Sequence, residues 1–274
     1  MITPRKSLAK KSRISEDRGI LFLEKQFTAK SLTQLVNGDT VAIRVQDFYD
    51  GDTGDRLGEW IMDESARVRL EANLDTNRKY PSYNRCEDLQ TIYETEDRGL
   101  PSRATTASKM KAVVGRMDPL SEVLRSLSAA WPHGAEVSTY YGEKEYAGKG
   151  WVYAPGTKSD PHTDESDECP RNFAANVYLI VPERGGELLI MKKPEIEEWL
   201  SGKYGAHREL LMQHPDLHTD HPRSSYLIKP QRGELIIFDS SHYHAVRPSK
   251  EGYRVTFNMF IKMKSTDGPF LISQ

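Results

Sequence analysis

The stretch GELIIFDSSHYHAVRP (233–248), followed closely by YRVTFNMFIKM (253–263), decides the fold class. Both segments contain short runs rich in Val, Ile, Tyr and Phe, bounded by Gly, Pro and Asp, which is the composition of β-strands separated by turns. Five similar runs precede them. The seven expected strands are 136–141, 150–153, 173–182, 187–192, 226–229, 234–239 and 253–263. Seven short strands at close spacing predict a sheet sandwich or a barrel.

The residues before these strands mostly carry the periodicity of helices. Apolar residues at helical spacing predict a helix over 15–35. Residues 40–49 alternate between apolar and polar and predict a strand, followed by a polar loop at 50–52. Residues 102–130 predict a second helical region, which Pro119 interrupts because proline cannot continue the hydrogen-bond ladder.

These elements predict an α+β fold in which amino-terminal helices pack on one sheet of a β-barrel. We expect a jelly-roll core over about 135–263 and a single domain over 15–274, preceded by a disordered basic tail at 1–14. A helical insert begins at Pro194 between the fourth and fifth strands. With the polar, His-rich and Pro-rich residues that follow, it forms a segment of about 194–225 that is typical of an active-site lid.

Composition and charge disfavour several classes of partner. Lys and Arg number 38 against 40 Asp and Glu, for a formal net charge of -2. This balance argues against nucleic acid or an anionic membrane and favours a small-molecule substrate. Because the chain has neither the apolar run of a secretory signal nor that of a membrane span, we expect a cytoplasmic protein. Its two cysteines, Cys86 and Cys169, are expected to be free thiols.

A candidate metal site is formed by Pro161-His162-Thr163-Asp164 and a histidine in the segment 239–248. Two histidines and one carboxylate on one face of an octahedral ion leave positions open for substrates, as in non-haem iron(II) oxygenases. Residues i and i+2 of an extended segment point the same way, so His162 and Asp164 can both face a barrel interior.

The sequence also contains competing candidates for metal ligands. His218-Thr219-Asp220 repeats the HTD pattern, but it stands in a polar stretch without strand character, and we expect it not to bind metal. The histidines of the same stretch are His207, His214, His218 and His221, and we interpret them as part of a solvated loop rather than a zinc site. His242 and His244 have the same strand parity, so parity alone cannot choose between them.

One face of the last expected strand is suited to binding a carboxylate. Its apolar face is Val255, Phe257, Met259 and Ile261, and its other face is Arg254, Thr256, Asn258 and Phe260. If the second face lines the metal site, Arg254 and Thr256 supply a planar guanidinium and a hydroxyl for a carboxylate. A half-exposed strand with these residues in solvent would show the same pattern. Tyr178 shares a face with Asn172, Ala174 and Asn176, which fits either a cavity wall or a packing tyrosine.

In order and spacing, these segments resemble the 2-oxoglutarate and iron(II)-dependent dioxygenases. The resemblance is carried by Tyr141-Gly142, HTD at 162–164, Tyr178-Leu179, Gly185-Gly186-Glu187-Leu188, GELIIFDSSHYHAV at 233–246 and Tyr253-Arg254-Val255-Thr256. It implies a double-stranded β-helix, also called a jelly roll. It also implies iron(II) bound by His162, Asp164 and His244, with 2-oxoglutarate and molecular oxygen as co-substrates. In this family an arginine roughly ten residues past the distal histidine binds 2-oxoglutarate, which selects His244 and assigns that role to Arg254, with Thr256 and Tyr178 beside it.

Within the family, VPERGGELLIMKKPEIEEW (181–199) and the HYHAV segment (242–246) resemble free-standing halogenases of indole alkaloids and relatives that hydroxylate N-acylated amino acids. The halogenases have glycine in place of the carboxylate ligand, whereas this chain has Asp164. The resemblance therefore implies hydroxylation, or another oxidation such as desaturation, of a small molecule. That oxidation is coupled to the decarboxylation of 2-oxoglutarate to succinate.

Two alternatives remain open at this point. A β-barrel with two histidines and a carboxylate could be a cupin-like metal-binding module without oxygenase activity, although Arg254 and Thr256 argue against it. The chain could also hydroxylate side chains of peptides or proteins. Candidates for the substrate side of the site are the residues that flank the metal motif, namely Trp151, Tyr153, Arg171 and Asn172. Aromatic residues in barrel strands are, however, also common in cores.

Overall fold

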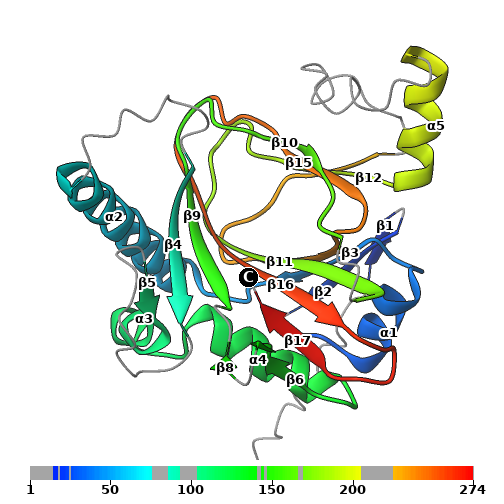
Figure 1. Ribbon diagram of the computed structural model, residues 1–274, viewed down its shortest axis with the longest axis horizontal. Helices are drawn as coiled ribbons and strands as arrows, with labels where there is room; N and C mark the ends of the chain where they lie inside the picture. Colours follow the sequence, from blue (N-terminus) through cyan, green and yellow to red (C-terminus); the bar gives the residue numbers. More distant parts are fainter. Residues whose placement is uncertain are drawn as a thin grey trace, which may run out of the picture.

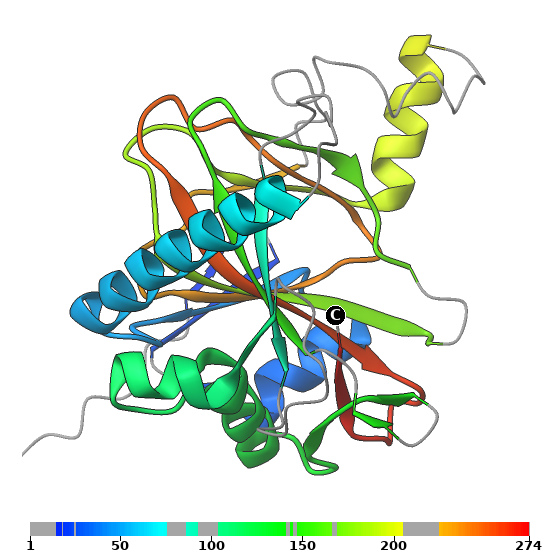
Figure 2. The ribbon, with the colours of Figure 1, turned by 60° about the vertical axis from the view of Figure 1, so that its left-hand side comes forward.

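Two β-sheets face each other in the computed structural model, and helices cover the outer side of the larger sheet (Figures 1 and 2). The structure describes residues 15–17, 19–24, 26–75, 86–92, 104–140, 143–144, 147–165, 169–204 and 225–273. The expected tail at 1–14 and the second HTD motif with its neighbouring histidines lie outside these residues. Among the helices of the described residues, none is long and apolar enough to cross a membrane.

The larger sheet has eleven strands. They are β1 (Ser15–Asp17), β2 (Ile20–Glu24), β3 (Ala42–Gln46), β4 (Cys86–Ile92), β5 (Ala104–Thr106), β6 (Ala135–Val137), β9 (Gly148–Tyr153), β11 (Arg171–Ile180), β14 (Leu235–Asp239), β16 (Arg254–Met263) and β17 (Phe270–Ser273). The order is β1-β2-β3-β14-β11-β16-β9-β4-β5, and β17 joins β16 to β6.

The smaller sheet consists of β10 (Ser159–His162), β12 (Leu188–Met191), β13 (Tyr226–Ile228) and β15 (Tyr243–Val246). Its order is β10-β15-β12-β13, and a separate two-stranded sheet pairs β7 (Thr139–Tyr140) with β8 (Glu143–Lys144). The helices are α1 (Ala29–Asn37), α2 (Gly51–Asp75), α3 (Ala107–Val114), α4 (Pro119–Ala130) and α5 (Lys193–Tyr204). The antiparallel four-stranded sheet facing β14-β11-β16-β9 forms the double-stranded β-helix, and the predicted α+β class is confirmed.

The central strand β11 is buried on both faces except at its two end residues. On its outer face, Val177 and Leu179 join the core that includes Leu57 and Ile61 of α2. On its inner face, Tyr178 joins a second core between the two sheets, with Phe238 and Leu188 among its members. The inner cluster therefore fixes the distance between the sheets, and the space left beside it becomes the site described below.

The close approach of α2 to the larger sheet depends on glycine. A Cβ atom at Gly58 of α2 would lie 2.7 Å from Cγ1 of Ile180, and one at Gly150 of β9 would lie 2.8 Å from Cγ2 of Ile61. Real Cβ atoms do not approach neighbours this closely, so a larger residue at either place would push the helix away from the strands.

The prediction of one helix over 15–35 is wrong. The segment contains β1, β2 and most of α1, which starts only at Ala29. Residues of β2 pair in parallel with β3, from Ile20↔Ala42 to Glu24↔Gln46, and this pairing overrides the helical spacing of the apolar residues. The helix begins after Thr28, whose hydroxyl accepts a hydrogen bond from the Ser31 N–H, and it ends at Gly38 with φ of 79°.

The loop expected at 50–52 is also wrong, because α2 begins at Gly51. The Asp50 carboxylate accepts a hydrogen bond from the Thr53 N–H at 2.8 Å and so satisfies one of the free donors at this helix start. The expected break at Pro119 is confirmed, with Asp118 as N-cap of α4, but residues 104–106 form strand β5 rather than helix.

Candidate functional site

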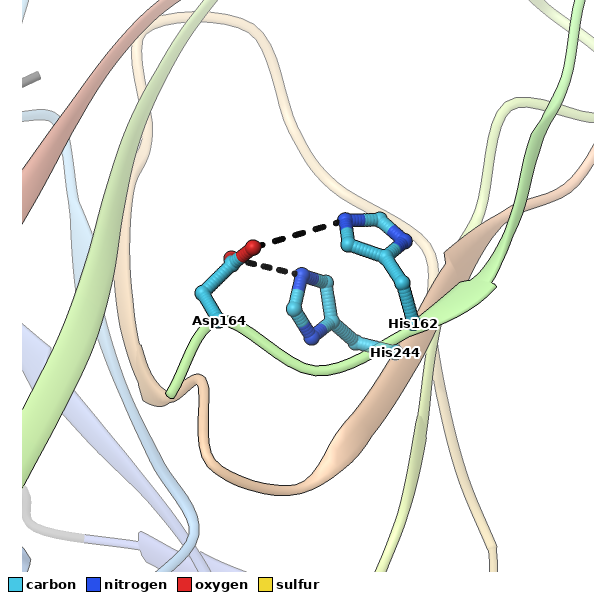
Figure 3. Close-up of side chains that lie close together, drawn as sticks. All are labelled: His162, Asp164 and His244. Atoms are coloured by element: carbon cyan, nitrogen blue, oxygen red, sulfur yellow. Dashed lines mark ion pairs between the residues drawn. The ribbon is translucent and has the colours of Figure 1, made fainter. Parts of the chain in front are cut away.

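Three potential metal ligands meet at one edge of the smaller sheet. His162 ends β10 and pairs in register with His244 of β15, which sets their rings side by side with centroids 4.3 Å apart. Asp164 follows two residues after His162, and its N–H donates to the carbonyl of Ser240 at 2.8 Å. Figure 3 shows the three side chains pointing toward one another. One nitrogen or oxygen from each side chain lies within 4.8 Å of the others.

Backbone carbonyls orient both histidine rings. Nδ1 of His162 lies 2.7 Å from the carbonyl oxygen of Asp160, and Nδ1 of His244 lies 3.0 Å from that of His242. A carbonyl oxygen only accepts, so each Nδ1 carries the proton and each Nε2 keeps a lone pair. These Nε2 atoms are 3.8 Å and 3.1 Å from the two carboxylate oxygens of Asp164. The donor set therefore matches a divalent metal held by two imidazoles and one carboxylate.

The surroundings of His162 keep its ring neutral. Partial burial lowers the pKa of His162, and the neighbouring His244 lowers it further. A neutral imidazole is the form that binds a metal. His244 is the more enclosed of the two, because the Phe238 ring packs edge-on against it with centroids 4.9 Å apart.

A cavity of about 140 Å³ extends from this triad into the space between the sheets. Arg254 lines it and is 2% exposed, and its Nε and Nη1 atoms have no hydrogen-bond partner among the described residues. The guanidinium lies between the rings of Tyr153 and Tyr178, at 4.9 Å and 5.1 Å from their centroids. A buried cation that lines a cavity and has unsatisfied donors is suited to bind an anion.

Tyr178 does not line this cavity directly. Its side chain is fully buried and accepts a hydrogen bond from Nη2 of Arg254 at 3.4 Å. Burial raises the pKa of Tyr178, although the nearby Arg254 opposes this effect, so the hydroxyl keeps its proton and can donate it. Tyr178 therefore supports Arg254 from behind.

The inner face of β16 lines the cavity as its alternation suggested, with Arg254, Thr256, Asn258 and Phe260 all contributing. Asn258 also donates to Oδ1 of Asn176 on β11 at 2.7 Å. Trp151 and Tyr153 of β9 complete this wall. The prediction that this face of β16 lines the metal site is confirmed, and the alternative in which it meets solvent is wrong.

Three other residues considered from the sequence lie outside the cavity that contains Arg254. Asn172 lines a second cavity on the other side of Asp164. Arg171 lines neither cavity and lies 3.5 Å from the carboxylate of Asp239. His242 is outside the triad, and its Nδ1 lies 3.5 Å from the N–H of Lys193 at the start of α5. Asn176, Asn258, Phe260 and Lys262 were not proposed as site residues, although the parity of their strands could have identified them.

The comparisons with known proteins agree with this geometry. The profile of the 2OG-Fe(II) oxygenase superfamily matches residues 148–262, which contain the triad and Arg254. The fold is similar to that of an N-substituted L-amino acid dioxygenase from Burkholderia ambifaria AMMD in complex with alpha-KG, with a TM-score of 0.50, 15% identity and 96% of each chain covered. A prolyl-4-hydroxylase from Pseudomonas putida gives a TM-score of 0.43 at 15% identity, covering 84% of this chain and 95% of that one.

The comparison with curated protein sequences finds no match. The profile match spans β9 to β16, the strands that carry the metal triad and the arginine. Residues 148–262 therefore match the 2OG-Fe(II) oxygenase superfamily, and the two histidines, the aspartate and the arginine in this region fit the iron(II) and 2-oxoglutarate in that name.

Proposed function

We propose that this protein hydroxylates a C–H bond of a small molecule, coupled to the conversion of 2-oxoglutarate to succinate and carbon dioxide. The observation that carries the proposal is the buried guanidinium of Arg254, which lines the same cavity as the triad and has two donors without a hydrogen-bond partner among the described residues. A cupin-like module that only holds a metal has no need of a second, anion-binding centre. Leaving a charged donor buried without a partner is costly, so its presence favours a bound carboxylate.

In this proposal Arg254 holds the distal carboxylate of 2-oxoglutarate through Nε and Nη1. Thr256, two residues along the same face of β16, supplies a hydroxyl. Tyr178 accepts from Nη2 and so holds the guanidinium from behind. Tyr153 covers the other face of the guanidinium, so its plane is fixed before the ligand arrives.

His162, Asp164 and His244 would hold iron(II), since two lone-pair nitrogens and a carboxylate converge there. Bound iron supplies the oxidising chemistry that joins decarboxylation of 2-oxoglutarate to oxidation of the substrate. The protein fixes the ligands through backbone carbonyls and encloses His244 behind Phe238. Because Asp164 provides an anionic oxygen ligand, the site favours oxygen transfer over halogenation.

The substrate side is consistent with a small molecule, such as an amino acid derivative. The cavity between the sheets is about 140 Å³, and the second cavity beyond Asp164 is about 430 Å³. The fold is also similar to that of the N-substituted L-amino acid dioxygenase named above. We further propose that residues 15–274 form one domain, because β2 and β3 from the beginning of the chain and β17 from its end complete the larger sheet.

The test is consumption of 2-oxoglutarate by purified protein supplied with iron(II), measured as succinate, over a panel of free and N-acylated amino acids. Arg254→Ala should weaken 2-oxoglutarate binding by tens-fold or more, because removing one member of a buried charge pair costs about 2 to 5 kcal/mol. Arg254→Lys should restore it only in part, because lysine lacks the planar fork.

Arg184→Ala serves as the control, since this arginine is exposed and pairs with Glu251 on the surface. Unchanged 2-oxoglutarate affinity in Arg254→Ala would remove the main support for the proposal. Metal binding without any 2-oxoglutarate turnover would identify the cupin-like alternative instead, and turnover only with peptides would identify the peptide hydroxylase.

A further inference from the structure

The inner face of β16 carries a positive charge at each end. Arg254 begins the strand, and Lys262 stands on the same face eight residues later, after Thr256, Asn258 and Phe260. At about 3.4 Å per residue, the two positions are roughly 27 Å apart along the strand. Arg254 is assigned to 2-oxoglutarate, which leaves the second cation without a role in the proposed function.

Lys262 lines the second cavity, which has a volume of about 430 Å³. Asp164 and Phe260 line both this cavity and the one that Arg254 lines, so the two cavities meet beside Asp164 of the triad. A molecule in the second cavity would therefore approach the triad beside Asp164. This position stays open to a primary substrate while 2-oxoglutarate occupies the first cavity.

The second cavity has one charge that is not compensated within the described part of the chain. Glu165 also lines the cavity, but its carboxylate lies 2.6 Å from the ammonium of Lys193. Asp164 faces the two histidines as a metal ligand. Lys262 has no carboxylate within ion-pair distance among the residues that the structure describes. As far as the described residues go, an occupant of this cavity thus meets a positive charge that no carboxylate neutralises.

The other walls define the rest of the ligand. Asn172 of β11 lies directly across from Lys262 in the sheet register. Its Nδ2 uses one hydrogen on the carbonyl of Cys169 at 3.0 Å, so the second hydrogen remains available for donation. Phe260 is partly buried, lines both cavities and offers an apolar surface.

We propose that the second cavity binds the primary substrate and that Lys262, with Asn172, binds a carboxylate of that substrate. Phe260 contacts the apolar part between this carboxylate and the carbon that is oxidised near Asp164. The substrate class is thus an apolar carboxylic acid, including N-acylated amino acids with a free carboxylate. This inference rests on the proposed function, because it uses Arg254 as the site of 2-oxoglutarate and the triad as the site of oxidation.

The experiment compares each acid of a panel with its methyl ester. The panel contains N-acetyl and N-succinyl derivatives of leucine, valine and phenylalanine, together with straight-chain fatty acids of four to eight carbons. Binding to the iron(II) protein with 2-oxoglutarate is measured by calorimetry without oxygen, and turnover is measured as succinate with oxygen. We expect the best acid to bind at least about tenfold more tightly than its ester, as suits a charge-assisted contact.

Lys262→Gln should weaken binding of the acid about tenfold and leave the ester unchanged, and Lys262→Glu should weaken the acid further. Lys264→Gln is the matched control, because Lys264 is exposed beyond the end of β16. The affinity for 2-oxoglutarate should be unchanged in all three variants, which also shows that they are folded.

Equal binding of acid and ester, or an acid affinity that Lys262→Gln does not alter, would overturn the inference. A panel in which no acid binds would overturn it as well. These results leave the proposed function intact as long as Arg254→Ala still weakens 2-oxoglutarate binding. Failure of the proposed function would instead show as a 2-oxoglutarate affinity that is independent of Arg254.

Discussion

The metal triad depends on main-chain carbonyls more than on other side chains. Asp160 and His242 each orient a ligand histidine through the carbonyl oxygen, which every residue possesses. Substitution of the orienting residue should therefore be tolerated where substitution of the ligand is not. This difference separates the ligand His244 from its neighbour His242 experimentally.

We expect His162→Ala and His244→Ala each to lose bound iron and activity, because each removes one of three ligands. His242→Ala should keep most of the bound iron, since its carbonyl remains to accept from Nδ1 of His244. His218→Ala should also keep it. Metal content after dialysis and calorimetry with Mn²⁺ measure the effect. Loss of metal in His218→Ala would mean that the second HTD motif is the true site.

Asp164 decides between oxygen transfer and halogenation. Asp164→Gly removes a ligand and its charge, so iron should bind more weakly and hydroxylation should fall sharply. The assignment does not require this variant to chlorinate, because a halogenase must also aim its substrate at the halide. Product masses with and without chloride, using an identified substrate, provide the test. Chlorinated product from the native protein would contradict the assignment, and full activity in the variant would show that Asp164 is not a ligand.

The candidate site could be predicted from sequence where strand parity governs it. His162 and Asp164 share a direction because their segment is extended, and Arg254 and Thr256 share one because β16 is regular. Lys262 follows the same parity, but its importance depends on the second cavity. That cavity exists because the loop after β10 passes beside β11 and β16, and sequence pattern carries no information about such a long-range arrangement.

At the scale of elements, a buried ion pair joins the amino-terminal strands to the jelly roll. The guanidinium of Arg44 on β3 donates to both carboxylate oxygens of Glu234, at 2.6 Å and 2.8 Å, and to the carbonyl of Lys229 at 3.0 Å. Their side chains are 10% and 1% exposed. The Glu234 carboxylate also accepts a hydrogen bond from the N–H of Gln231 at 2.9 Å, so both of its oxygens have hydrogen-bond donors.

Glu234→Ala should lower the free energy of unfolding by about 3 to 5 kcal/mol, because it leaves the Arg44 cation buried without its partner. Asp55→Ala breaks an exposed pair with Arg232 and should cost no more than about 1 kcal/mol. Urea unfolding of both variants measures the difference. Equal stability of the two variants would show that solvent reaches Arg44 readily.

The elements that sequence analysis missed are those defined by distant partners. Residues of β2 have helical apolar spacing and become a strand because β3 lies alongside. Asp50 precedes α2, and the first turn of the helix contains Asp52 and two glycines, a composition that suggests a loop. Asp50 nevertheless caps the helix, and Gly58 allows it to reach Ile180. By contrast, β11, β14 and β16 were predicted well, because each is long or strongly apolar and bounded by turn residues.

For the whole molecule, the two proposed binding centres belong to opposite sheets. The smaller sheet and the loop after it carry the metal ligands, and the larger sheet carries Arg254. A 2-oxoglutarate molecule that contacts both would connect the sheets across the cavity. Ligand binding and the stability of the fold should therefore be coupled.

We expect Mn²⁺ alone to raise the melting temperature and 2-oxoglutarate with Mn²⁺ to raise it further. A ligand at 100 times its Kd adds about 2.7 kcal/mol, or roughly 5 to 10 °C for a chain of this size. Arg254→Ala should keep the increment from the metal and lose that from 2-oxoglutarate. Scanning calorimetry tests this, and an undiminished second increment in the variant would contradict the connection between the sheets.

Side chains of β16 alternate strictly between the cavity and the helix-covered core. This alternation limits insertions and deletions within the strand. Insertion or deletion of one residue between Arg254 and Phe260 would exchange the two faces of the strand beyond that point. Polar groups such as Asn258 would then enter the helix-covered core, and Phe257 or Met259 would fill the cavity. Related proteins should therefore vary in length at the exposed turn around Gly252, and β16 itself should keep a constant length.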